Sequence, residues 1–140
     1  MVRIVPALAK LGIAHWLFGN LYEEVVKMPE RLGADEPLLG PGSPVRYYLP
    51  VAPLTVGAAV VAARRAPRGG SRARLTAAAA CTIAGAMLTG HLVRAVIVPL
   101  TSGRVSEPHE RARLAAHWHR ANRLRIVLAA TALVASAAGR

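Results

Sequence analysis

With 140 residues and a mass of 14.7 kDa, the chain is expected to form one domain. Its hydrophobic content of 54% and mean hydropathy of +0.35 are too high for an ordinary small soluble protein and argue against disorder. A single cysteine, Cys81, excludes an internal disulfide, and an aromatic content of 4% leaves few rings to stack on bases. The net charge of +11 therefore does not indicate a DNA-binding fold; the composition indicates a membrane protein.

The first predicted span runs from about residue 6 to residue 28. No Ala-x-Ala cleavage signature follows its apolar run, so we expect this span to be retained. Glu24 is expected to point away from the polar face of this helix. That face is a single stripe at helical spacing, formed by Trp16, Asn20, Glu23 and Lys27.

Two further spans are predicted over residues 47–63 and 75–100, where long uncharged runs approach the length that crosses a bilayer. The connection over residues 29–46 contains four prolines and three glycines, which predicts an irregular surface loop without a helix. Pro50 and Pro53 should bend or end the second helix near its start, and Pro99 should do the same to the third helix near its end.

The connection between the second and third spans carries five arginines between residues 64 and 74 and no acid. The positive-inside rule places this connection and both termini in the cytoplasm. All seven acidic residues fall within 23–36 and 107–110, on the opposite side. A fourth span over about residues 114–138 opens with Trp118, Asn122 and Arg125 at helical spacing.

The prediction is therefore an all-α transmembrane four-helix bundle, one membrane domain over residues 1–140 with cytoplasmic termini, in a multi-pass protein of the plasma membrane. A soluble bundle would need polar residues at every third or fourth position, and the span over 47–63 offers only Thr55 and two terminal tyrosines. The predicted protein would be surrounded by the lipid bilayer. Nucleic-acid binding is not expected, because the basic run has no accompanying basic helix or aromatic platform. The sequence does not decide whether the chain forms a homo-oligomer.

The polar residues of the spans are predicted to converge in the outer half of the bundle. A rise of about 1.5 Å per residue places His91 roughly 24 Å and Glu23 roughly 26 Å from the cytoplasmic ends of their helices. We expect Glu23, His91 and Arg125 to be catalytic in this layer. Two alternatives stay open: Glu23 as the partner of Arg94 or Arg125 in a structural ion pair, and His91 as an interhelical hydrogen-bonding group. Substrate contacts are expected from Asn20, Arg94, Trp118 and Asn122.

A metal site has only weak support in the sequence. His117 and His119 are two residues apart on a helix, about 200° around its axis, so at most one of them faces the interior. Ligands would have to come from several helices, and the set would suit copper, zinc or iron. The cofactor is therefore either absent or a copper or iron ion, and the metalloprotease, nucleotide and serine-hydrolase motifs are missing. The candidate ligands are His15, Glu23, His91 and His119.

Three groups of residues give the chain a resemblance to the small four-span membrane proteins of the anthrone oxygenase-like family. The first is Gly19-Asn20 followed by Glu23 and Pro29. The second is Val98-Pro99-Leu100 with Gly103-Arg104-Val105, although Thr101 stands where such proteins often have Asn. The third and most specific is Trp118-x3-Asn122-x2-Arg125, which resembles the W-x3-N-x2-R signature of the family.

The resemblance implies an integral membrane oxidoreductase that oxidises an activated aromatic or similar small hydrophobic metabolite with dioxygen in biosynthesis. A His or Glu base would remove an acidic proton, and Arg125 or Asn122 would stabilise the resulting anion. Two mechanisms stay open, one without a cofactor and one assisted by a metal ion. The alternative from another class is a non-catalytic membrane partner subunit or small-molecule binding protein, whose buried charges only hold helices together.

Overall fold

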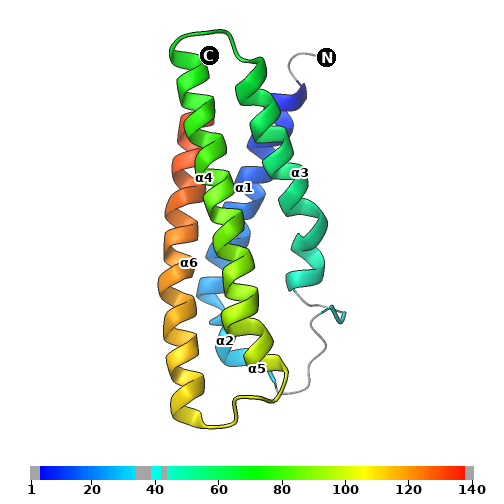
Figure 1. The fold of residues 1–140 in the computed structure, drawn as a ribbon, viewed down its shortest axis with the longest axis vertical. Helices are drawn as coiled ribbons and strands as arrows, with labels where there is room; N and C mark the ends of the chain where they lie inside the picture. The colour runs from blue at the N-terminus through cyan, green and yellow to red at the C-terminus, as the bar shows by residue number, and fades with distance from the viewer. Residues whose placement is uncertain (1–3, 34–38, 42–43, 138–140) are drawn as a thin grey trace.

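The protein is all-helical in the part of the chain that the computed structural model describes, which is residues 4–33, 39–41 and 44–137. Four long helical segments dominate it: α1 (Ile4–Val25), α3 (Pro44–Arg65), α4 (Gly70–Leu92) and α6 (Pro108–Ala137). Two short helices, α2 (Met28–Arg31) and α5 (Val98–Thr101), lie at one end (Figure 1). Each of the four predicted spans is therefore helical in the structure.

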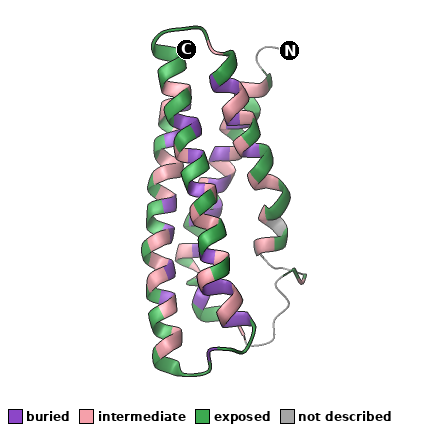
Figure 2. Cartoon of the chain, viewed as in Figure 1, coloured by how far each residue is buried: buried purple, intermediate pink, exposed green. Residues whose placement is uncertain are grey.

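The four long helices pack side by side in the order α1, α3, α4 and α6 around a closed ring, so α1 is diagonally opposite α4. The connection from α3 to α4 lies at the same end as the first turn of α1 and the last turn of α6 (Figure 1). We call this the basic end. The opposite end holds α2, α5 and the start of α6, and we call it the acidic end. Buried residues face inward along all four helices, as Figure 2 shows.

Small residues bring α1 and α3 together. A Cβ atom at Gly12 would overlap the side chain of Thr55, and one at Gly19 would overlap the hydroxyl of Tyr48. The two glycines are seven residues apart and therefore share one face of α1. Backbones approach closely where an interface contains such residues. Nearer the basic end the packing depends on alanines, namely Ala9, Ala59, Ala63 and Ala79.

Two helical segments are candidate membrane spans. Ile4–Val25 and Gly70–Thr101 are long and apolar enough to cross a membrane, and only 28% and 22% of their apolar windows are buried. A core helix of a soluble protein would be mostly buried, so these segments resemble lipid-facing helices. α6 is rich in charge, with three arginines between residues 120 and 125.

Proline has different effects from those predicted. Pro29 occupies the first turn of α2, where its missing N–H is tolerated, so the prediction that residues 29–46 contain no helix was wrong. α3 starts at Pro44 and continues through Pro50 and Pro53, so neither ends it. Ahead of Pro99 the helix widens into a π-helical turn, η1 (Val93–Ile97), and then resumes as α5. This turn accommodates a residue that lacks a donor and whose ring would clash with the carbonyl four residues earlier.

The end of α1 closes over the acidic end of the core. Lys27 has a φ of 50° in the left-handed region, which ends α1 at Val25, three residues before the predicted boundary, and reverses the chain into α2. Met28 is thereby buried against Trp118 in a cluster that also contains Leu92, Val96, Ile97 and Leu100. Lys27 itself is exposed, so the polar stripe of α1 is buried at Trp16, Asn20 and Glu23 but not at its last member.

Candidate functional site

The centre of the candidate site is a buried ion pair between α1 and α6. Arg125 Nη1 lies 3.3 Å from Glu23 Oε2, and the two side chains are 4% and 9% exposed. Both residues were predicted to be in this layer, and the alternative that Glu23 pairs with Arg125 describes the observed contact. Taking two charges out of water is costly unless they are paired and hydrogen-bonded, so this pair determines how α1 and α6 sit against each other.

Three further predicted residues surround the pair. Asn20, Trp118 and Asn122 are each 2% exposed or less. Asn122 donates from Nδ2 to the backbone carbonyl of Asn20 at 3.0 Å, which ties the polar stripe of α6 to that of α1. The spacing of Trp118, Asn122 and Arg125 on α6 places all three on one face, as the sequence predicted.

Several polar atoms of this cluster have no hydrogen-bond partner among the residues that the structure describes. They are Oδ1 of Asn20, Oδ1 of Asn122 and Nε of Arg125. A buried polar atom without a partner costs about 1–3 kcal/mol, so native structures contain few of them. Two acceptors and one donor gathered in one place indicate a position where a water molecule or a polar group of a ligand is bound.

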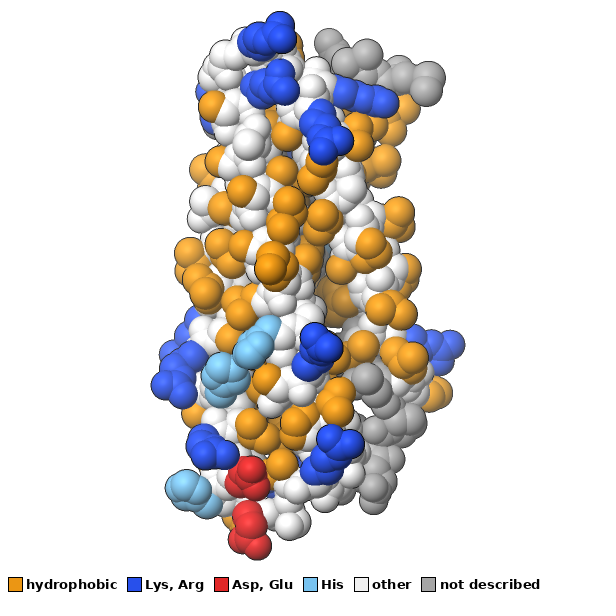
Figure 3. All heavy atoms as spheres, in the orientation of Figure 1, with side chains coloured by type: hydrophobic (Ala, Val, Ile, Leu, Met, Phe, Trp, Pro, Cys, Tyr) orange, Lys and Arg blue, Asp and Glu red, His pale blue; other side chains and the backbone are white. Residues whose placement is uncertain are grey.

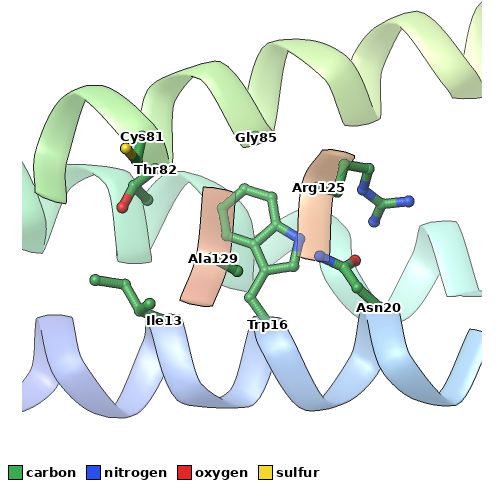
Figure 4. A pocket seen from close by; sticks show the side chains of 8 residues that line it. All are labelled: Ile13, Trp16, Asn20, Cys81, Thr82, Gly85, Arg125 and Ala129. Atoms are coloured by element: carbon green, nitrogen blue, oxygen red, sulfur yellow. The ribbon is translucent and has the colours of Figure 1, made fainter. Parts of the chain in front are cut away.

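Arg125 separates two small cavities. One, of about 10 Å³, lies between α1, α4 and α6 and is just large enough for one water molecule. There the indole of Trp16 extends from α1 toward α4, with Asn20 and Arg125 on one side and Thr82 on the other (Figure 4). The second cavity, of about 40 Å³, is lined from all four long helices by residues that include Glu23, Tyr48, Thr89, Trp118 and Arg125. We call this second space the Glu23 cavity.

Glu24 was predicted to point away from the polar stripe of α1. In the structure it is the centre of a second polar network, at the acidic end. Its Oε1 accepts from Arg123 Nε at 2.9 Å, and its Oε2 lies 3.0 Å from Asn122 Nδ2 and 3.1 Å from His119 Nδ1. The other ring nitrogen of His119 is 2.9 Å from Glu30 Oε1. Carboxylates only accept hydrogen bonds, so this arrangement suits an imidazolium that donates from both nitrogens.

A signal for this second network was present in α6. His119, Asn122 and Arg123 are spaced at i, i+3 and i+4, so one stripe offers donors that match a single carboxylate. Adjacent residues on α1, Glu23 and Glu24, contact α6 on either side of the line where the two helices meet. The prediction concerned the faces of α1 alone, so it did not reveal which helix Glu24 contacts.

His91 and Arg94 do not belong to the buried layer, and here the prediction was wrong. Both are exposed, and the Nε2 atom of His91 lies 3.3 Å from Nε2 of His117 on the outer surface. The buried face of α4 is formed by small and apolar residues, including Ala78, Thr82, Gly85 and Leu92. Helical rise gives the height of His91 correctly, but its direction around the axis is away from the core.

The residues suggested as metal ligands are not gathered by the fold. His15 packs beside Tyr48, with ring centroids 6.1 Å apart, while His91 contacts His117 and His119 contacts Glu24 and Glu30. Among the described residues no three histidine, cysteine, aspartate or glutamate side chains are placed to hold one ion. The residues present therefore do not fit the copper or iron site considered above. As predicted from their spacing, His117 and His119 face different partners.

Arg111 is a further residue that the sequence did not single out. Its guanidinium donates to the backbone carbonyls of Leu32 at 2.6 Å, Val105 at 3.3 Å and Leu100 at 3.5 Å. These carbonyls belong to three segments that meet beneath the site at the acidic end. Arg111 thereby ties these segments together at the acidic end, and it does not line the Glu23 cavity.

Comparison of the chain with protein families, with curated proteins and with solved structures finds no match.

Proposed function

We propose that the protein is an integral membrane oxidoreductase that uses dioxygen to oxidise a small, activated aromatic or similarly hydrophobic metabolite in the Glu23 cavity. The observation that carries the proposal is a carboxylate–guanidinium pair, buried at the wall of a cavity to which all four long helices contribute. Ionisable groups inside a membrane helix are costly and usually have a function. The resemblance of Trp118-x3-Asn122-x2-Arg125 to the anthrone oxygenase-like signature supplies the reaction class.

In this proposal all four long helices cross the bilayer as a bundle in the plasma membrane, and the basic end faces the cytoplasm. Supporting this, apolar side chains cover the middle of the face drawn in Figure 3, and charged side chains lie toward its two ends. Large exposed residues such as Leu11, Phe18, Leu54, Met87 and Val134 contribute to the apolar surface. A soluble monomer rarely exposes so much contiguous apolar area. The distribution of arginines sets the orientation.

The chemistry assigned to the site begins with proton removal. The Glu23 carboxylate takes a proton from a carbon acid activated by flanking aromatic rings or a carbonyl group, and the carbanion that forms is held by the Arg125 guanidinium. Dioxygen, which dissolves in the bilayer, accepts the electrons and binds the same carbon. For a CH₂ group the balance is CH₂ plus O₂ giving C=O plus H₂O: carbon is oxidised, one oxygen atom enters the product, and the other leaves as water.

The size of the Glu23 cavity limits how the substrate is admitted. Its volume of about 40 Å³ holds water, whereas ligand pockets usually measure about 300–1,000 Å³. A ring system therefore enters only if one wall moves. In the proposal this wall is the start of α3, where Val45 and Tyr48 line the cavity, because the residues described between α2 and α3 (32–33 and 39–41) are not helical.

The test is oxygen consumption and quinone formation by the purified full chain in lipid nanodiscs, with anthrone as the probe and the rate without protein subtracted. Glu23→Gln keeps the shape of the side chain but removes the base, so the enzymatic rate should fall at least about 100-fold. Glu110→Gln is the matched control, because this carboxylate lies on the exposed start of α6. His91→Ala should also leave the rate unchanged, since His91 lies outside the cavity.

The proposal fails if Glu23→Gln and Arg125→Lys both retain the native rate while their unfolding midpoints show folded protein. A disulfide engineered between the start of α3 and α1 tests the entry route separately. Locking this wall should block turnover of anthrone reversibly, with recovery on reduction.

The second candidate is a non-catalytic membrane partner subunit, and the Glu24 network favours it. Glu24, His119, Arg123 and Glu30 satisfy one another, as expected of groups that only hold helices in place. Under this alternative, joint replacement Glu23→Gln/Arg125→Gln preserves the function of the protein in its cell. Under the oxidoreductase proposal the same double variant folds but has no turnover.

A further inference from the structure

The largest described cavity outside the candidate site lies at the basic end. Its volume is about 240 Å³, several times that of the Glu23 cavity. All four long helices contribute to it, so it is a feature of the assembled fold rather than of one loop. An engineered apolar cavity of roughly 150 Å³ already admits benzene, so this space is large enough for a small ligand group. Its polar lining comes from Lys10, Arg65, Ser71, Arg74 and Ser136.

Positive charge in this cavity is not neutralised by any carboxylate side chain among the described residues. Lys10, Arg65 and Arg74 reach it from three different helices. The described carboxylates lie in the last turn of α1, in α2 and at the start of α6, all at the acidic end. On the face drawn in Figure 3, blue side chains cap the basic end and red ones occur only at the other end. Three cations around one cavity attract an anion.

Arg74 has unused hydrogen-bonding capacity. Its Nε is buried and has no partner in the described part of the chain, and its Nη2 reaches Ser71 Oγ only at 3.5 Å, the outer limit of a hydrogen bond. Ser71 lies in the first turn of α4, where backbone N–H groups are free of helical partners and the helix dipole favours negative charge. Guanidinium, hydroxyl and helix terminus therefore all present donors to the same space.

We propose that this cavity binds the phosphoryl group of a phosphate ester that has an apolar part. A planar guanidinium binds phosphate oxygens in pairs, and a lysine ammonium adds a point charge. The remaining wall is apolar, with Val5, Ala62 and Leu75, and suits a carbon chain attached to the phosphate. The site is separate from the Glu23 cavity and does not depend on the oxidoreductase proposal.

The phosphoryl group has two sources, a phospholipid of the surrounding membrane or a soluble phosphate, and the experiment separates them. The full chain in a neutral detergent is titrated with dihexanoyl phosphatidic acid in one arm and with inorganic phosphate in the other. A ligand that binds only the folded protein raises its thermal unfolding midpoint in a saturable way, and the midpoint gives an apparent Kd. Dihexanoyl glycerol, which has the same acyl chains and no phosphate, controls for non-specific effects of lipid.

Matched pairs of arginines make the variants specific. Arg74→Gln and Arg65→Gln should each weaken binding about tenfold, since one hydrogen bond to a charged group is lost. Arg72→Gln and Arg64→Gln remove the same charge from neighbouring residues of the same helices that do not line the cavity, and should change Kd less than twofold. Lys10→Gln gives a third test if Arg74→Gln proves unstable.

Each outcome decides the proposal. Saturable stabilisation by phosphatidic acid but not by inorganic phosphate assigns the site to a lipid headgroup, and stabilisation by both assigns it to phosphate in general. Stabilisation by neither overturns the proposal. So does an equal loss of affinity in the matched control variants, because the effect would then reflect net charge alone.

Discussion

The two ends of the molecule differ in whether their buried or cavity-lining charges are paired with opposite charges. At the acidic end, Glu23 is paired with Arg125, and Glu24 is surrounded by His119, Asn122 and Arg123. At the basic end, three cations line a cavity without a carboxylate side chain among the residues described. The Glu23 cavity, of about 40 Å³, is also much smaller than the cavity at the basic end, of about 240 Å³.

This difference separates charges that stabilise the fold from charges that can bind a ligand. A buried charge whose partner is on a neighbouring helix fixes the geometry of those helices, and removing the partner exposes the full cost of burial. A charge without a partner contributes little to the fold and is available to a ligand. The acidic end is therefore expected to respond to substitution mainly through stability, and the basic end mainly through binding.

The largest effect is expected from breaking the buried pair on one side only. Arg125→Met leaves the Glu23 carboxylate buried without its cation, and should lower the free energy of unfolding by about 3–5 kcal/mol. The measurement is chemical unfolding of the full chain in detergent micelles. The double variant Glu23→Leu/Arg125→Met should recover most of this loss, since apolar side chains of similar volume often replace a buried pair at little cost.

The control for this experiment is Glu110→Gln. Glu110 forms an exposed pair with Arg113, 3.6 Å apart, and such pairs contribute less than about 1 kcal/mol. A loss in Arg125→Met no larger than in this control would show that the acidic end is not held by its internal pairing, and the comparison between the two ends would not stand.

The positions of the helices were largely predictable, because uncharged runs bounded by arginines and prolines delimit them. The helix boundaries were less predictable. α1 ends at Val25 rather than near residue 28 because Lys27 adopts a left-handed conformation that no residue type demands. The π-helical turn ahead of Pro99 likewise depends on how the chain compensates for a missing donor, for which a break and a widened turn are both solutions.

The candidate site was predictable in part, for a geometric reason. Periodicity groups Trp118, Asn122 and Arg125 on one face of α6, and that face was correct. Height along a helix follows from residue counting, but the direction of a side chain around the axis depends on the neighbouring helices. His91 was therefore placed at the right level and on the wrong side, while the prediction that Glu24 lies off the polar stripe of α1 did not reveal the donors of α6 around it.

A smaller effect is expected from Arg111, which tests whether the acidic end depends on neutral acceptors as well as on ion pairs. Arg111→Met removes the donor to the carbonyls of Leu32 and Val105 and should cost about 1–3 kcal/mol of unfolding free energy. The loss of unfolding free energy in Arg111→Lys should lie between zero and the loss in Arg111→Met, because one ammonium cannot reproduce the fork of a guanidinium. Arg113→Met, on an exposed side chain, should be close to neutral, and equal losses in the two methionine variants would contradict the role given to Arg111.

The smallest effect, with the opposite sign, is expected at the basic end. In neutral detergent without phosphate, Arg65→Gln removes a cation that has only like charges around its cavity, so stability should stay the same or rise by up to about 0.5 kcal/mol. Raising the salt concentration to about 1 M shortens the Debye length to about 3 Å and should abolish this gain. A loss of more than about 1 kcal/mol would instead show that Arg65 is held by a partner within the protein. The sign of this change in the free energy of unfolding, rather than its size, distinguishes a charge that is available to an external ligand from one that holds helices together.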